Sequence, residues 1–183
     1  MSGTHGKRGM SLVVNSPEAE AQSRLIAMRM VALTLRLMER WRGLIHDNDS
    51  AMIMMAVALI NTESLTRTEL AEHGIADIKN GVPPDLLRKC NISSVALATG
   101  LNRETTRRKI THLVERGFLA KGADGHVYLK PELAIREQMA HTVRSQLETL
   151  AKSANDFLRD GTLKLLDDPD SWAQADEGHP SPS

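Results

Sequence analysis

The sequence predicts a mainly α-helical protein with a helix-turn-helix at its centre, a short β-hairpin after it, and long helices at both ends. Residues 93–129 read as a helix, a tight turn, a second helix and two short strands around a Gly/Asp turn. Along both flanking segments, apolar residues recur at three- and four-residue steps, as they do on a packed helix face. Of the 183 residues, 41% are hydrophobic and 25% are charged, as in ordinary soluble domains. A hairpin in that position is a wing, so the predicted fold is a winged helix-turn-helix.

The turn between the two central helices contains the residues that such a turn requires. Gly100 stands where the first helix ends, a position that is often left-handed and therefore favours glycine. Asn102 suits the N-cap of the second helix, and Glu104 complements the positive end of its dipole. The second helix, residues 103–116, is expected to pack on one face and to present basic side chains on the other. Its packed face contains Thr106, Ile110, Leu113, Val114 and Gly117, and the opposite face carries Arg103, Arg107, Arg108 and Thr111.

The flanking helices are predicted to meet a second copy of the chain. Pro17 begins the first, with Ser16 as its N-cap, and residues 17–46 carry apolar side chains on more than one side. The second covers residues 131–166 and has a single apolar seam of coiled-coil type. We therefore expect a homodimer whose interface includes Leu25, Met28, Leu35, Met139, Val143, Leu147, Leu150 and Ala154.

Positive charge is concentrated near the second central helix, although the formal net charge of the chain is zero. Residues 86–121 contain eight basic residues against two glutamates: Arg88, Lys89, Arg103, Arg107, Arg108, Lys109, Arg116 and Lys121. A charge run of this kind is usually a solvated helix face. Next to a helix-turn-helix and a wing, however, it favours binding to the phosphate backbone of DNA.

These segments predict the organisation of the chain. A flexible leader covers residues 1–16, a winged-helix domain covers 17–166 with its DNA-binding core at 85–130, and an acidic disordered tail covers 167–183. The apolar run at residues 51–60 predicts a short buried helix. Residues 64–74 look like the start of another helix-turn-helix, but Gly81, Pro83 and Pro84 would break a second helix there and no basic face appears. We therefore place the DNA-binding helix-turn-helix later in the chain, at residues 93–116.

No pattern in the sequence indicates catalysis or a metal centre. The seven histidines never pair at i, i+4, the single cysteine excludes a CxxC pair, and no phosphate-binding loop or nucleophile elbow occurs. We expect no enzymatic activity, no cofactor and no metal. Cys90, close to Arg88 and Lys89, fits either an oxidant-sensing thiolate or a small packed residue. One cysteine and a longest apolar run of ten residues predict a cytoplasmic protein without a membrane span.

The central stretch resembles the DNA-binding half of winged-helix transcription regulators, closest to the catabolite-activator and GntR types. The resemblance is carried by Ala96, Gly100, Leu101, the segment Asn102-Arg103-Glu104-Thr105-Thr106-Arg107-Arg108, and Gly117-Phe118-Leu119. It implies that Arg103, Glu104 and Arg108 face base edges, and that Thr105, Arg107 and Lys109 meet phosphates. Ser93, Ser94, Asn102, Lys121 and His126 complete the candidate DNA-binding set, the last two from a wing at residues 118–129. The order of flanking helices looks like that of MarR-type dimers.

The sequence therefore predicts a homodimeric regulator that binds specific double-stranded DNA. Two alternatives use the same elements: a winged helix that binds an acidic protein partner, and a plasmid or phage DNA-maintenance factor. The sequence leaves room for a small-molecule effector without any residue pattern that supports one.

Overall fold

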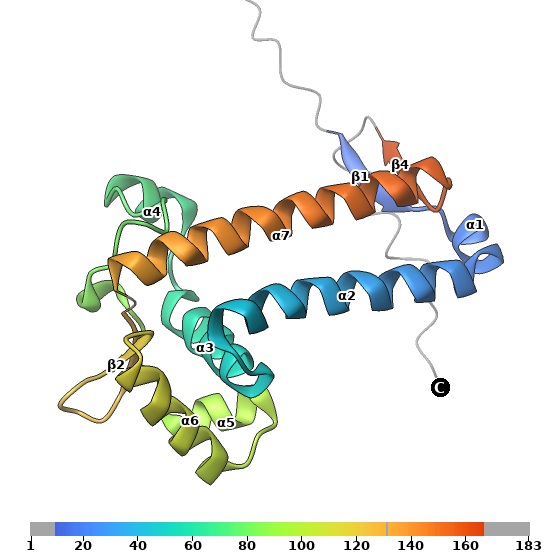
Figure 1. Cartoon of the computed structure of the whole chain (residues 1–183). Coiled ribbons are helices and arrows are strands. Elements are labelled where there is room, and N and C mark those ends of the chain that lie inside the picture. The colour runs from blue at the N-terminus through green and yellow to red at the C-terminus, as the bar shows by residue number, and fades with distance from the viewer. Residues whose placement is uncertain (1–9, 131, 167–183) are drawn as a thin grey trace, which may run out of the picture. The chain divides into compact units, whose positions relative to one another are not determined.

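The computed structural model describes residues 10–130 and 132–166 and is mainly helical, as predicted (Figure 1). The helices are α1 (Ser16–Ala21), α2 (Ser23–Ile45), α3 (Asn48–Thr62), α4 (Arg67–Glu72), α5 (Ile92–Thr99), α6 (Arg103–Glu115) and α7 (Leu133–Arg159), with a short 3-10 helix at Pro84–Leu86. The strands β1 (Ser11–Val14) and β4 (Leu163–Leu166) form one antiparallel pair, and β2 (Leu119–Lys121) and β3 (Val127–Leu129) form another.

The described residues fall into two compact units. One unit contains residues 35–147, and the other combines the described parts of residues 1–34 and 148–183. The boundaries between the units fall within α2 and α7, so each of these helices contributes residues to both units.

The unit of residues 35–147 is built around α3. The predicted buried run forms the middle of this helix, where Ala51, Ile53 and Val57 are inaccessible to solvent. They belong to one apolar core with Ile45, Val95, Ile110, Leu113, Phe118, Val127 and Met139. Helices α5 and α6 and the hairpin β2–β3 are thus positioned by packing on α3.

Asn61, near the C-terminal end of α3, is a fully buried polar residue that links three segments. Its side-chain Nδ2 donates to the carbonyl oxygen of Arg88 at 2.7 Å and to that of Val127 at 3.3 Å. Its Oδ1 accepts from the Leu129 backbone N–H at 2.7 Å. The Asn61 side chain therefore holds both strand β3 and the segment before α5 against α3.

The predictions for the two ends of the chain were partly wrong. Within the predicted flexible leader, Ser11–Val14 forms β1, and within the predicted last helix, Leu163–Leu166 forms β4. Helix α7 ends at Arg159 because Gly161 adopts a left-handed conformation, with φ of 75°. The chain then turns back and pairs Val14 with Leu163 and Ser11 with Leu166. Residues 1–9, Pro131 and the predicted acidic tail, 167–183, lie outside the described residues.

The first long helix also differs from its prediction. The N-cap of α1 is Asn15 rather than Ser16, and the helix is interrupted at Gln22 before α2 begins. Among the residues that the structure describes, no helix is long and apolar enough to cross a membrane.

Candidate nucleic-acid interface

The turn from α5 into α6 has the predicted local structure. Gly100 ends α5 in the left-handed region with φ of 68°. Asn102 caps α6, since its Oδ1 accepts from the Glu104 N–H at 2.8 Å. Thr106, Ile110 and Leu113 are buried, and the hydroxyl of Thr106 donates to the Asn102 carbonyl oxygen at 3.0 Å. The predicted packed face of α6 is therefore confirmed.

The opposite face of α6 is exposed along its whole length. It presents Arg103, Glu104, Arg107, Arg108, Thr111 and His112 to solvent. Thr105 is only half-buried, next to Thr106. Helix α6 therefore has one face buried in the core and one exposed face rich in arginine.

The start of α5 is organised by a cap that the sequence interpretation missed. Asn91 Oδ1 accepts from the backbone N–H of Ser94 at 2.9 Å and lies 3.2 Å from the Ser94 hydroxyl. Ser93 is exposed on the first turn. Of the two serines in the predicted DNA-binding set, Ser93 is thus the accessible one, and Ser94 is engaged in the cap.

The hairpin tip is held together by Asp124. The backbone N–H of His126 donates to Asp124 Oδ1 at 3.1 Å, and Lys89 Nζ lies 3.2 Å from Asp124 Oδ2. The hydrogen bond from the His126 backbone, with the nearby Lys89 and His126 side chains, lowers the pKa of Asp124 to about 2. His126 Nδ1 lies 3.0 Å from the same carboxylate, so His126 belongs to the internal structure of the tip.

The structure sorts the eight clustered cations into two groups. Five have partners within the protein. Arg88 pairs with Glu63, Lys89 with Asp124, Arg107 with Glu104 and Lys109 with Asp47, while Arg116 donates to the Ile45 carbonyl oxygen and lies over the Phe118 ring. The other three, Arg103, Arg108 and Lys121, are exposed and make no ion pair with any residue that the structure describes. Their charges are available to an external anion.

Glu104 and Arg107, both predicted to contact DNA, bind each other. Arg107 Nη2 lies 2.5 Å from Glu104 Oε1, and Arg107 Nε lies 2.9 Å from Oε2. This hydrogen bonding lowers the pKa of Glu104 and raises that of Arg107. Both side chains are well exposed, where such a pair is weak, so either partner can exchange it for a stronger one.

Lys109 was predicted to contact phosphate, but it joins two helices instead. Its Nζ lies 2.7 Å from Asp47 Oδ1, and the same oxygen accepts from the Ser50 N–H at 2.8 Å as the N-cap of α3. Partial burial opposes ionisation of Asp47, but these hydrogen bonds outweigh it and lower its pKa to about 2. The contact fixes the start of α3 to the middle of α6.

Asp47→Ala is expected to lower the free energy of unfolding by about 1–2 kcal/mol at neutral pH, because it removes a helix cap and the partner of Lys109. Since the folded-state pKa of Asp47 lies below its ordinary value of 3.8, ionisation stabilises the fold above that value. This stabilisation is lost as the pH falls towards about 2. The difference in the free energy of unfolding between wild type and variant should therefore be constant from pH 5 to 8 and shrink below pH 4. Urea unfolding at each pH measures it.

Asp49→Ala is the matched control, because Asp49 is the neighbouring acid in the first turn of the same helix but does not cap it. Its effect should be about 0.5 kcal/mol or less. A pH-independent difference for Asp47→Ala would contradict the role of the ionised carboxylate.

Cys90 has the properties of a packed residue. It is completely buried, and its carbonyl oxygen accepts from the Val127 N–H in an isolated β-bridge. Burial raises the pKa of the thiol to about 11. A protonated, inaccessible thiol reacts slowly with oxidants, so the packing interpretation is the better one.

The predicted dimer residues divide into exposed and buried ones. Met28 is 66% exposed, Leu35 64% and Leu147 65%, and Leu25, Val143 and Leu150 are also exposed. Ala154 is half-buried. Met139 was assigned wrongly, because it is only 3% exposed and packs in the core of its own unit.

Two helices carry stripes of exposed apolar side chains. Along α2 the stripe contains Met28, Val31 and Leu35, and along α7 it contains Val143, Leu147 and Leu150.

The described residues contain no group of three or more His, Cys, Asp or Glu side chains that could hold a metal ion. Comparison of the chain with protein-family models, curated proteins and solved structures finds no match.

Proposed function

We propose that α5, α6 and the hairpin β2–β3 act as a winged helix-turn-helix that binds double-stranded DNA in a sequence-specific manner. The observation that carries the proposal is the exposed face of α6, where Arg103 and Arg108 are unpaired among the described residues. In this proposal α6 enters the major groove. An arginine there can donate two hydrogen bonds to guanine O6 and N7.

The neighbouring groups contact the backbone in this proposal. Ser93 at the start of α5 and Lys121 on β2 are exposed and lie on elements that pack with or next to α6. Contacts to phosphate position the protein without reading sequence. Lys109 and His126 are left out of the proposed interface, because Asp47 and Asp124 engage them.

The protein acts as a homodimer in this proposal, as bacterial transcription regulators of this architecture do. Exposed apolar stripes on α2 and α7 support the dimer, because a soluble monomer rarely exposes contiguous apolar surface of this kind. A two-fold dimer would read two inverted half-sites about one helical turn apart, or about 10 base pairs.

Selection of duplexes from a random library tests the proposal, followed by fluorescence anisotropy with the selected and a random duplex. We expect an inverted repeat to be selected, and affinity to fall steeply between about 50 and 200 mM salt. Light scattering should give twice the mass of one chain, and Leu35→Glu with Leu147→Glu should give the mass of one chain. No binding to either duplex at low salt would refute the proposal and favour the protein-interaction module.

A further inference from the structure

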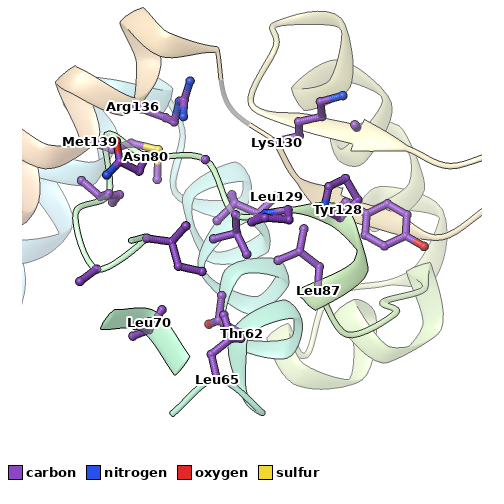
Figure 2. Close-up of a pocket in the computed structure, with 18 of the residues that line it drawn as sticks. Thr62, Leu65, Leu70, Asn80, Leu87, Tyr128, Leu129, Lys130, Arg136 and Met139 are labelled. Atoms are coloured by element: carbon purple, nitrogen blue, oxygen red, sulfur yellow. The ribbon is translucent and has the colours of Figure 1, made fainter. Parts of the chain in front are cut away.

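A cavity of about 810 Å³ lies within the unit of residues 35–147. Its walls come from the end of α3, α4 and the loop after it, the hairpin β2–β3, and the first turns of α7 (Figure 2). Pockets that hold small organic ligands have volumes of about 300–1,000 Å³, so this cavity is large enough for one.

Most of the wall is aliphatic. Leu65, Leu70, Ile75, Val82, Leu87 and Met139 are among the described lining residues. The one aromatic side chain among them is Tyr128, whose hydroxyl lies 3.4 Å from Asp124 Oδ2 in the hairpin tip. A wall of branched aliphatic side chains favours an aliphatic ligand over a stacked aromatic one.

The charged part of the wall is entirely positive. Lys121, Lys130 and Arg136 line the cavity, and no described lining residue is an aspartate or a glutamate. None of the three cations forms an ion pair with a residue that the structure describes. A concave, largely apolar surface strengthens the field of such charges, so the cavity attracts anions.

Arg136 is the cation with an unmet hydrogen-bonding need. Its Nε is buried and has no hydrogen-bond partner among the described groups. Its guanidinium lies directly over Gly81, where a Cβ atom would be 2.8 Å from Nη1. A buried unpaired donor costs free energy, and a carboxylate satisfies a guanidinium with two parallel hydrogen bonds. In Figure 2, Arg136 and Lys130 lie on one side of the cavity, and Leu65 and Leu70 lie on the other.

We propose that this cavity binds an aliphatic monocarboxylate, with its carboxylate on Arg136 and its hydrocarbon chain against Leu65 and Leu70. The carboxylate would pair with the guanidinium of Arg136, and the ligand would remove its own chain from water. The site does not depend on the function of α6.

Occupation of the cavity also bears on the proposed DNA interface, and this second step rests on that function. Lys121, on strand β2, lines the cavity and also belongs to the proposed DNA-binding surface. The negative charge of a carboxylate bound in this cavity would offset part of the positive charge that Lys121 offers to a DNA phosphate. The two ligands should therefore weaken each other by the same factor.

Isothermal titration calorimetry without DNA tests the site, with decanoate, 1-decanol and decylamine as probes. Their chains are equal and their head groups differ, so the comparison isolates the charge. Decanoate should bind at least about tenfold more tightly than decanol, and decylamine should show no measurable binding. Equal affinities for decanoate and decanol, or no binding of decanoate at 1 mM, would overturn the proposal.

Three variants locate the carboxylate. Arg136→Gln should weaken decanoate at least about tenfold and leave decanol unchanged. Gly81→Ala keeps every charge but displaces the guanidinium, so it should also weaken decanoate selectively. Arg67→Gln removes an exposed positive charge from α4 outside the cavity and should have no effect. Loss of decanoate affinity in all three variants alike, or in none of them, would overturn the assignment to Arg136.

Anisotropy with the selected duplex tests the second step. Saturating decanoate should weaken DNA binding by about three- to tenfold, and decanol should not. Decanoate that binds without changing DNA affinity would overturn the coupling. A protein that binds decanoate but no DNA would refute the proposed function and leave the ligand site standing.

Discussion

Replacing Arg103 and Arg108 together by alanine is expected to weaken binding to the selected duplex by at least about 30-fold. Each arginine that pairs with a guanine gives about 1–3 kcal/mol of discrimination, so two amount to at least about 2 kcal/mol, or roughly 30-fold in Kd. Binding to a random duplex should fall much less, because only charge is lost there. Neither arginine forms an ion pair with a described residue, and the attraction between Arg108 and the exposed Glu104 is weak, so stability should change little. Anisotropy with both duplexes and a thermal melt measure these effects.

Arg88→Ala with Lys89→Ala is the matched control. It also removes two positive charges from the basic cluster, but these charges belong to side chains that pair with Glu63 and Asp124. We expect a loss of a few fold on both duplexes and no change in their ratio. If both double variants lowered the two affinities by the same factor, α6 would not read bases.

The centre of the molecule could be predicted because its signals are local. The Gly100 turn, the Asn102 cap and the buried face of α6 depend on residues within a few positions of one another, and the structure has all three. The hairpin around residues 122–125 arises from the same kind of short-range signal.

The ends of the chain could not be predicted, because their structure depends on distant partners. Ser11–Val14 and Leu163–Leu166 are too short to be stable alone and form strands by pairing with each other. In the sequence, the first looks like part of an unstructured leader and the second like the continuation of an apolar helix seam. Met139 illustrates a related limit, since helical periodicity cannot show whether an apolar seam faces its own core or another subunit.

The sequence also could not show which basic residues are free to contact DNA, because their acidic partners lie far away in the sequence. Lys109 and Asp47 are 62 residues apart, and Lys89 meets Asp124 across the hairpin tip. The sequence shows a basic cluster of eight residues, but only the fold shows which charges are neutralised internally. For that reason the candidate site is narrower than predicted and centres on Arg103, Arg108 and Lys121.

Asn61 ties the hairpin to α3 through side-chain hydrogen bonds, and no sequence pattern indicated it. It comes directly after the apolar run of α3, where a polar residue usually marks an exposed helix end. Its side-chain partners Arg88, Val127 and Leu129 are 27, 66 and 68 residues away. Buried and fully bonded, it replaces several backbone contacts that the short strands β2 and β3 cannot supply.

Asn61→Ala is expected to lower the free energy of unfolding by about 3–4 kcal/mol and the Tm by roughly 10 °C. The variant leaves the Leu129 N–H and the Arg88 carbonyl oxygen, in partly buried surroundings, and the buried Val127 carbonyl oxygen without their side-chain partner, and each buried group left unpaired costs about 1–3 kcal/mol. Urea unfolding and thermal melts measure the loss.

Asn80→Ala is the control, because the amide of Asn80 also donates to a backbone carbonyl, that of Gly74, at 2.8 Å, but in an exposed loop. Water can replace that bond, so the loss should be under about 0.5 kcal/mol. Similar losses in the two variants, or less than about 1 kcal/mol for Asn61→Ala, would show that the buried amide does not hold the hairpin. In that case the packing of Phe118, Leu119 and Val127 on α3 would have to position β2 and β3 alone.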